Sequence, residues 1–368
     1  MASYINNLII GQYRGINSMV ISDLNNINII VGDNNSGKTS LLETIYLLRS
    51  PETFTNILAT SRLRTQGLTS SAMPYEQFIN ILPKDGNQIF VQADGEFGNV
   101  SLKVVGKEIM TEVIEEDLKY QSAVLKYVKS TGLIGKEVTA FVGNLYSLVN
   151  SKRKELPIRF TSISRNLSHI SNKDFINVKY LSPISHMTDN TFDKIVRMEG
   201  YKSICIELLR LFDPQIEDLV YMRNEHSGRA VEYIKSKNHG MMPLSAYGDG
   251  IKKVLSLANA VIESAGGILL IDEIDTSIHY KYYEDIFNFI IKACEKFNVQ
   301  LFITTHSKEA IDEILKTQEY DENKKGELCD PINVITFRKD EFGKICSRSM
   351  SGFDVHCNRE LFDFEVRL

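Results

Sequence analysis

Residues 29–43 read IIVGDNNSGKTSLLE, in which an apolar β-branched run, a loop of small polar residues and an apolar helical pattern follow one another. The loop from Gly32 to Thr39 fits the pattern G-x-x-x-x-G-K-[ST] at every fixed position. Glycines let consecutive backbone N–H groups turn toward one anion, and the start of the following helix adds partial positive charge there. The stretch therefore predicts a strand, a phosphate-binding loop and a helix, as in a P-loop fold.

The side chains of this loop predict a nucleotide site. Lys38 can reach the β- and γ-phosphates, and the Thr39 hydroxyl can ligate Mg²⁺. The residues expected to contact the nucleotide are Asn34, Asn35, Ser36, Gly37, Lys38, Thr39 and Ser40. The loop alone does not indicate which class of nucleotide-hydrolysing protein this is.

The stretch ILLIDE, residues 268–273, predicts the second half of the site, because it is a buried strand that ends in two acids. Beside a phosphate loop, Asp272 can hold the Mg²⁺, and Glu273 can orient and polarise the attacking water. We therefore expect Glu273 to be catalytic, with Thr39 and Asp272 as the protein ligands of the metal.

A polar turn in PLSAYGDGIKKVLSLANAV, residues 243–261, precedes an amphipathic helix that begins near Ile251. A hydroxyl and free backbone N–H groups at a helix start form a second anion-binding end. One triphosphate rarely needs two such ends from one chain, whereas two chains that face each other would supply one each. The polar and glycine residues of this turn are Ser245, Gly248, Asp249 and Gly250.

Further polar residues follow the buried strands. LFITTHS places His306 at the end of a strand, where it can hydrogen-bond a γ-phosphate or the attacking water and act in catalysis. Asp275 lies just past Glu273 and is expected in a loop that crosses a dimer interface. His279 either contributes to that loop or is a surface residue, and the sequence leaves both readings open.

The composition is that of a globular chain: 368 residues, 43% hydrophobic, 24% charged and a net charge of −5. No apolar run approaches the roughly 18 residues of a membrane helix, and no signal peptide is evident, so we expect a cytoplasmic protein without a membrane partner. Five scattered cysteines without a C-x-x-C pair predict free thiols. The acidic balance confines any contact with nucleic acid to a local patch, a dimer groove or a partner.

The pattern along the chain predicts an α/β fold with a mixed sheet. Residues 4–15, 19–24 and 27–32 read as strands, and residues 87–106 read as a hairpin with DGEFGN as its turn. Alternating strands and helices in the last third predict a parallel sheet covered on both faces.

These patterns suggest a single domain over residues 1–368 with three parts. Residues 1–108 form an N-terminal lobe with the phosphate loop (Walker A), and residues 109–175 form an inserted helical lobe. Residues 176–368 form a C-terminal lobe with the polar turn, the acidic strand end (Walker B) and His306.

The order of GDNNSGKT, LSAYGDG, ILLIDEID and TTHS resembles the ATP-binding cassette head of the SMC, Rad50 and RecF group. The nearer resemblance is to the ATPase domain of OLD-family proteins and related ATPases of bacterial anti-phage defence. In such heads the arginine of a sequence like YRGI can reach the nucleotide, which makes Arg14 a candidate. The glutamine loop of the family matches either Gln77 or Gln88. The resemblance implies that the signature turn with Ser245, Gly248 and Gly250 meets the γ-phosphate of the partner's nucleotide. Asp249, inside this turn, departs from the family's L-S-G-G-Q signature, so the correspondence of the glycines stays open.

The resemblance implies that ATP and Mg²⁺ are the cofactors and that ATP closes a homodimer, or a higher even oligomer, around two nucleotides. The family's toprim nuclease spacing is missing after His306. The resemblance therefore implies an ATPase that controls a separate effector, such as a toprim or HNH nuclease, in anti-phage defence. The alternative is a RecF-like ATPase that binds DNA directly during repair.

Overall fold

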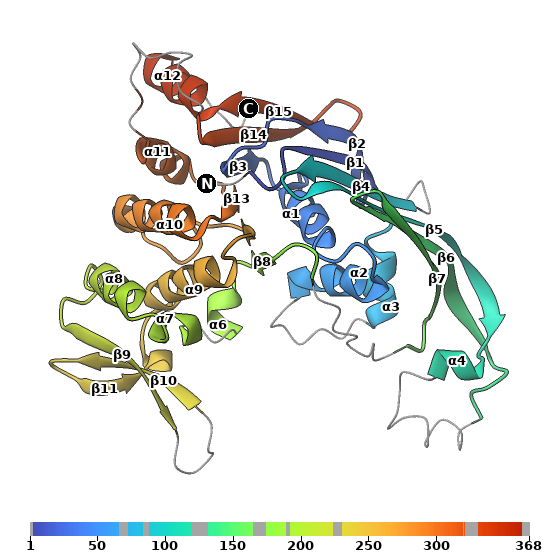
Figure 1. The fold of residues 1–368 in the computed structure, drawn as a ribbon, viewed down its shortest axis with the longest axis horizontal. Coiled ribbons are helices and arrows are strands. Elements are labelled where there is room, and N and C mark those ends of the chain that lie inside the picture. Colours follow the sequence, from blue (N-terminus) through green and yellow to red (C-terminus); the bar gives the residue numbers. More distant parts are fainter. Residues whose placement is uncertain are drawn as a thin grey trace.

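The computed structural model describes residues 3–65, 73–83, 88–118, 132–164, 174–188, 192–223, 230–318, 320 and 330–362. A six-stranded sheet, here the central sheet, has the order β15-β14-β3-β13-β12-β8 (Figure 1). Its strands are β3 (Ile27–Gly32), β8 (Val178–Leu181), β12 (Ile268–Ile271), β13 (Gln300–Thr304), β14 (Ile332–Lys339) and β15 (Ile345–Ser351). All neighbouring strands are parallel except β14 and β15. The predicted parallel sheet is confirmed.

The central sheet is buried on both faces. Ile29 and Val31 of β3 enter one hydrophobic core, and Ile30 between them enters the other. Consequently β3 is buried at every position, and apart from Asn28 and the terminal Gly32 its sequence is apolar without alternation. The strand that leads into the phosphate loop therefore lies inside the sheet and is held rigidly.

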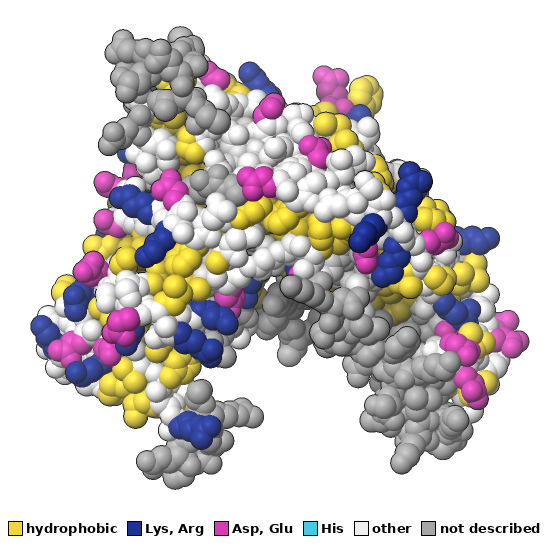
Figure 2. Space-filling view, in the orientation of Figure 1, with side chains coloured by type: hydrophobic (Ala, Val, Ile, Leu, Met, Phe, Trp, Pro, Cys, Tyr) yellow, Lys and Arg dark blue, Asp and Glu magenta, His cyan; other side chains and the backbone are white. Residues whose placement is uncertain are grey.

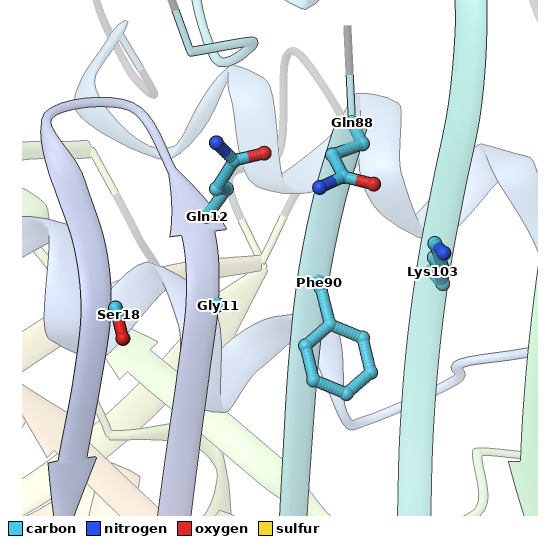
Figure 3. Close-up of a pocket in the computed structure, with 6 residues that line it drawn as sticks. All are labelled: Gly11, Gln12, Ser18, Gln88, Phe90 and Lys103. Atoms are coloured by element: carbon cyan, nitrogen blue, oxygen red, sulfur yellow. The ribbon is translucent and has the colours of Figure 1, made fainter. Parts of the chain in front are cut away.

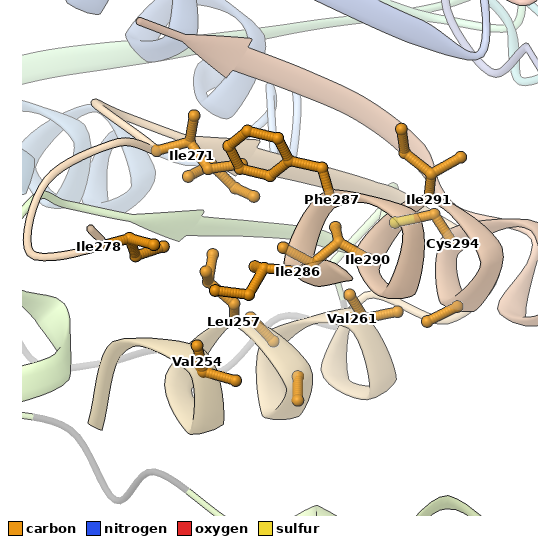
Figure 4. Close-up of a cluster of buried hydrophobic side chains, with 14 of the residues drawn as sticks. Val254, Leu257, Val261, Ile271, Ile278, Ile286, Phe287, Ile290, Ile291 and Cys294 are labelled. Atoms are coloured by element: carbon orange, nitrogen blue, oxygen red, sulfur yellow. The ribbon is translucent and has the colours of Figure 1, made fainter. Parts of the chain in front are cut away.

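Amphipathic helices cover the first face of the central sheet. They are α8 (Glu199–Leu209), α9 (Asp249–Glu263), α10 (Tyr283–Phe297) and α11 (Lys308–Lys316). Figure 4 shows Val254, Leu257 and Val261 on one side of α9, at the spacing of successive helical turns. They pack in one core with Ile290 of α10 and Ile271 of β12. This stripe fixes α9 against the strand that carries the acidic pair.

A second six-stranded sheet, here the antiparallel sheet, has the order β2-β1-β4-β5-β6-β7 and curves along one side of the molecule (Figure 1). Its strands are β1 (Asn7–Tyr13), β2 (Ile16–Ile21), β4 (Gln88–Gly95), β5 (Gly98–Glu112), β6 (Glu137–Val149) and β7 (Lys152–Thr161). The predicted hairpin over residues 87–106 is confirmed as β4 and β5. The sheet shares the second core with α1 (Lys38–Leu47), α2 (Phe54–Ser61) and α3 (Pro74–Ile79).

The helical content predicted for residues 109–175 is wrong for the strands β6 and β7. Val138, Phe141, Val142 and Leu145 have a spacing that fits a helix, but they lie in β6. Residues 150 and 151 form a two-residue turn in which both φ values are positive, 46° and 70°, and this turn matches the twist of a hairpin. Strand β5 also runs through residue 108, the expected boundary, and residues 119–131 and 165–173 lie outside the described part.

The remaining elements include a third sheet and several further helices. A three-stranded sheet, β11-β10-β9, precedes α9. The elements are β9 (Ile216–Arg223), β10 (Ala230–Ser236), β11 (Gly240–Pro243), α4 (Glu115–Leu118), α6 (Ser185–Thr188), α7 (Asp193–Val196) and α12 (Gly352–Phe362). Short 3₁₀ turns are η1 (Leu63–Thr65), η2 (Leu244–Ala246) and η3 (Tyr280–Tyr282). No helix within the described residues has the length and apolar character needed to span a membrane.

Candidate nucleotide-binding site

The phosphate loop leaves β3 and enters α1 through a sharply bent backbone. Gly32, Asn35 and Gly37 have φ values of 141°, 61° and 106°. A Cβ atom on Gly32 would lie 2.3 Å from the carbonyl oxygen of Phe337 in β14, so a larger residue does not fit. Gly37 is the N-cap of α1, and no side chain caps this helix. The first N–H groups of α1 are therefore available to an anion.

Lys38 begins α1 and is only 6% exposed. Its Nζ donates to the carbonyl oxygens of Gly32 and Asp33, at 2.8 Å in each case. Burial lowers the pKa of Lys38, and the negative charges of Asp272 and Glu273 oppose that shift. The ammonium group thus lies over the loop and within the field of the acidic pair, as a phosphate-binding lysine requires.

Asp272 follows β12 directly and is buried. Hydroxyl groups donate to its carboxylate from Thr39 at 3.0 Å, Tyr180 at 3.0 Å and Thr304 at 2.6 Å. Burial and the charge of Asp272 raise the pKa of Tyr180 well above its ordinary value, so the phenol remains a donor. The structure therefore brings the predicted pair Thr39 and Asp272 together.

Glu273 adopts a left-handed backbone conformation with a φ of 50°. Such a conformation costs a non-glycine residue about 1 kcal/mol and often marks a functional position. Its N–H donates to Thr304 Oγ1 at 2.8 Å, and its carboxylate accepts from Thr276 Oγ1 at 3.2 Å. Glu273 is half-buried. The acidic pair therefore has two environments, with Asp272 enclosed by hydroxyls and Glu273 closer to solvent.

Arg14 lies beneath the first turns of α1, where it binds Glu43. Its Nε is 2.7 Å from the Glu43 carboxylate, and Arg64 binds the same carboxylate at 2.8 Å. Glu43 is fully buried and also accepts from the Tyr13 hydroxyl at 3.2 Å. Arg64 additionally donates to Ser40 Oγ at 3.0 Å. Arg64, which the sequence did not predict, is thus the arginine of this cluster that contacts Ser40, the residue directly after the phosphate loop.

The turn predicted to act on a partner's nucleotide lies at the surface. Ser245, Gly248 and Asp249 are exposed, and Asp249 forms an ion pair with Lys252 at 3.2 Å. A Cβ atom on Gly250 would lie 3.4 Å from the Ser277 carbonyl oxygen, in the loop after the acidic pair. No hydrogen bond of the described residues joins this turn to the phosphate loop of the same chain.

Asp275 and His306 lie near the ends of neighbouring strands. Thr305 donates a hydrogen bond to the Asp275 carboxylate, which links the ends of β12 and β13. His306 follows β13, is half-buried and precedes Ser307, the N-cap of α11. His279 is exposed and stacks on Tyr280 with 4.5 Å between ring centroids, which fits both a surface residue and a residue of a loop at a dimer interface.

The two glutamines that match the glutamine loop lie in different places. Gln77 is buried in α3 and accepts a hydrogen bond from Arg62 at 3.1 Å. Gln88 begins β4 and lines a shallow hollow of about 400 Å³ on the antiparallel sheet (Figure 3). The hollow is lined by Gly11, Gln12, Ser18, Gln88, Phe90 and Lys103, and none of them belongs to the phosphate loop.

The residues fit a magnesium ion. Within the described part of the chain, no group of three or more His, Cys, Asp and Glu side chains could hold a metal. A magnesium ion at a phosphate loop needs fewer protein ligands, because it keeps water and substrate oxygens. The Thr39 hydroxyl and the Asp272 carboxylate, 3.0 Å apart, are hard oxygen donors of the kind that Mg²⁺ prefers.

Residues that the sequence did not predict complete the site: Arg64, Tyr180 and Thr304. Tyr180 comes from β8 and Thr304 from β13, which flank β12 on its two sides. Only the pairing of strands brings them to Asp272. The sequence carried a signal for Thr304, because the threonine pair of TTHS stands at the end of a buried strand.

The fold and the site define a P-loop nucleotide-binding protein of the α/β class. The model of the AAA ATPase domain family matches residues 4–194, just over half of the chain, and the chain belongs to this family. A second family model, described as AAA domain, putative AbiEii toxin, Type IV TA system, matches residues 133–312.

Relatives resemble the chain over most of its length. An ATP/GTP phosphatase of Helicobacter pylori is 25% identical over 346 residues, which cover 84% of this chain and 88% of that protein. The DNA replication and repair protein RecF of Francisella tularensis subsp. mediasiatica is 24% identical, covering 86% and 99%. The SMC head domain of Thermotoga maritima aligns over 94% and 99% of the two chains, with 13% identity and a TM-score of 0.43.

Proposed function

We propose that the protein hydrolyses ATP and that its ATP-bound form is a dimer that controls a separate effector. One observation carries the hydrolysis: Asp272 lies 3.0 Å from the phosphate-loop residue Thr39, and Glu273 follows it in a strained conformation. The family membership and the similarity to an ATP/GTP phosphatase support the same activity.

The side chains divide the reaction among them. The backbone N–H groups of residues 34–40 and the Lys38 ammonium bind the phosphates, and the Thr39 hydroxyl and the Asp272 carboxylate would hold Mg²⁺. The ion, when bound, neutralises charge on the β- and γ-phosphates. Glu273 accepts a proton from the attacking water, and His306 orients the water or the γ-phosphate. Arg14 and Arg64 hold α1, and with it the loop, in position through Glu43.

The proposed dimer is supported by the separation of two helix starts, those of α1 and α9, that we expect to bind anions. In the turn at the start of α9, Ser245 and Gly248 are exposed and Gly250 is half-buried, and no hydrogen bond among the described residues links this turn to its own phosphate loop. Two chains that face each other would place each turn against the partner's triphosphate, with Asp275 near the interface. Hydrolysis would then release the two chains.

We propose a separate effector because the candidate catalytic groups of the described residues all lie at the nucleotide site. Any further activity that ATP controls would then belong to another protein. The second matching family is described with a putative toxin of a type IV toxin–antitoxin system, which favours a role in controlled toxicity or anti-phage defence. We expect a partner, such as a toprim or HNH nuclease, to co-purify with the protein in a manner that depends on ATP. Equal co-purification with ATP, with ADP and without nucleotide would contradict this control.

The variant Glu273→Gln tests the catalytic cycle. It keeps the size of the side chain and removes its ability to accept a proton, so we expect hydrolysis to fall by about 100-fold or more while ATP binding persists. Sedimentation velocity should then show an ATP-dependent dimer that outlives that of the wild type. Glu284→Gln on the exposed side of α10 is the matched control and should behave as wild type. A Glu273→Gln protein that stays monomeric with ATP would contradict the dimer.

A RecF-like function in DNA repair is the second candidate, because the RecF relatives align over 99% of their own length. It requires a continuous basic surface. On the face shown in Figure 2, positive and negative side chains of the described residues are intermixed. Binding of duplex DNA measured between 50 and 200 mM salt separates the candidates, because direct phosphate contacts predict an affinity that falls by about 10³-fold or more over such a range. Absence of binding at low salt would reject the RecF-like role.

A further inference from the structure

Thr304 lies between the phosphate-loop strand and the acidic pair. It is the last residue of β13 and is fully buried. On one side its backbone pairs with Ile30 of β3, two residues before the phosphate loop begins. On the other side β13 pairs with β12, and this ladder stops at Ile271 and Ile303, directly before Asp272 and Thr304. Beyond the ladder, Thr304 contacts the acidic turn through its side chain and its carbonyl group.

Thr304 forms a hydrogen bond with each of the three residues that follow β12. Its hydroxyl donates to Asp272 Oδ1 at 2.6 Å and accepts from the Glu273 N–H at 2.8 Å. Its backbone carbonyl oxygen accepts from the Ile274 N–H at 3.1 Å. The directions are fixed, because an N–H group can only donate, an ionised carboxylate can only accept, and a hydroxyl has one proton. One side chain therefore sets the carboxylate of Asp272 and the backbone of Glu273 together.

The backbone of Glu273 needs such support. Its φ of 50° is a left-handed conformation, which costs a residue with a side chain about 1 kcal/mol and persists only where the surrounding contacts hold it. Thr276 closes the turn from within, because its N–H donates to the Glu273 carbonyl oxygen at 3.1 Å and its hydroxyl donates to the Glu273 carboxylate at 3.2 Å. The bonds to Thr304 attach this turn to the end of β13.

The Asp272 carboxylate is held from two sides. Thr304 binds Oδ1, while Tyr180 of β8 donates to Oδ2 at 3.0 Å. These two donors come from the strands that flank β12. The Thr39 hydroxyl is also 3.0 Å from Oδ2 and comes from the phosphate loop. The orientation of the carboxylate toward Thr39 thus depends on donors from both flanking strands.

We propose that Thr304 is a positioning residue for the two acids of the candidate site. Its hydroxyl orients the Asp272 carboxylate toward Thr39 and fixes the turn that carries Glu273, the proposed general base. Because the backbone of Thr304 pairs with β3, both acids keep a constant place relative to the phosphate loop. This inference rests on the proposed hydrolysis and names the residue that aligns its two acidic groups.

Thr304→Val tests this role, because valine keeps the branched shape of threonine and removes the hydroxyl. We expect kcat for ATP hydrolysis to fall by about 10- to 100-fold, the range seen when a partner of a metal-binding side chain is lost. The affinity for a fluorescent ATP analogue, measured without Mg²⁺, should change less than about two-fold, because Thr304 is not among the residues expected to contact the nucleotide. Thr304→Ser keeps the hydroxyl and should retain a kcat close to that of the wild type.

Hydrogen–deuterium exchange gives a measurement that does not depend on catalysis. In Thr304→Val the Glu273 N–H loses its acceptor, so the amides of residues 272–276 should exchange faster by about 5- to 10-fold, which corresponds to the loss of one hydrogen bond. The amides of β14 should keep their wild-type rates, because the loss is local. Thr304→Ser should leave the exchange of both segments unchanged.

Thr60→Val is the matched control. Thr60 is also fully buried, and its hydroxyl donates to the Asn56 carbonyl oxygen at 2.8 Å within α2, away from the acidic pair. This variant should leave kcat and the exchange of residues 272–276 unchanged. If Thr304→Val does not fold, Thr304→Ser and Thr304→Ala, which differ from each other by the hydroxyl alone, provide the same comparison.

A wild-type kcat or a wild-type exchange rate at residues 272–276 in Thr304→Val would overturn the proposal. Equal losses of activity in Thr304→Val and Thr304→Ser would also overturn it, because the packing of the side chain and not its hydroxyl would then matter. If the wild type itself hydrolyses no ATP, the proposed function fails, whereas the exchange rates still decide whether Thr304 holds the turn.

Discussion

At the scale of single residues, Glu43 is a buried charge that three side chains contact. Its carboxylate is fully buried and is shared by Arg14, Arg64 and the Tyr13 hydroxyl. Removing one partner of a buried ion pair usually costs about 3–5 kcal/mol. Because the side chain of Arg64 remains 43% exposed to water, we expect about 2–3 kcal/mol for Glu43→Gln. Urea denaturation followed by circular dichroism measures this loss.

A matched substitution separates this burial effect from the loss of a carboxylate as such. Glu263 forms an ion pair with Lys179 at 2.7 Å, and the two side chains are 27% and 34% exposed. Glu263→Gln should therefore cost less than about 1 kcal/mol. Equal losses for the two variants would show that the Glu43 cluster does not stabilise α1 beneath the phosphate loop.

At the scale of elements, the hairpin of β6 and β7 depends on its two-residue turn. Asn150 and Ser151 both have positive φ values, which glycine adopts more easily than serine. Ser151→Gly should raise the free energy of unfolding by up to about 1 kcal/mol, because the left-handed strain of serine is removed. Ser101→Gly, within strand β5, should instead lower it by about 1 kcal/mol, because glycine weakens an extended strand. Thermal and urea unfolding of both variants should give opposite signs, and equal signs would contradict the turn geometry.

The same hairpin shows why part of the fold escaped prediction. The apolar residues from Val138 to Leu145 fit a helical period as well as a strand, and the decision rests on pairing with β5 and on two φ values at the turn. By contrast, the phosphate loop was predictable because its geometry depends on consecutive residues. Gly32 and Gly37 both have positive φ values, which glycine adopts most easily. The two glycines in the motif therefore indicate this backbone geometry directly.

The residues of the candidate site also fall into two groups, those that a local sequence pattern predicts and those that only the tertiary structure brings together. Lys38, Thr39, Asp272 and Glu273 were predictable because each stands at a fixed place relative to a strand end or a helix start. Tyr180, Thr304 and Arg64 reach the site through strand order and side-chain packing, which no local pattern encodes.

At the scale of the whole molecule, α1 and α9 both begin at a glycine N-cap without a side-chain cap, and the proposal assigns an anion to each of these two helix starts. The phosphate loop leads into α1 beside the central sheet, and the polar turn leads into α9. The three-stranded sheet comes directly before this turn in the chain (Figure 1). If each nucleotide is enclosed by the loop of one chain and the turn of another, a defect in the loop and a defect in the turn should complement each other when they are in different chains.

Two variants with defects at different ends test this arrangement. Lys38→Ala removes the phosphate-binding ammonium, and Ser245→Arg obstructs the exposed turn without disturbing the core. Each variant alone should be almost inactive. A dimer of the two retains one site with an intact loop and an intact turn, and random exchange makes half of the dimers mixed, so an equimolar mixture should regain about a quarter of wild-type hydrolysis. A single chain carrying both substitutions, mixed with wild type, provides the control for exchange. If the mixed dimers form but regain no activity, each chain completes its own site, and the proposed arrangement is wrong.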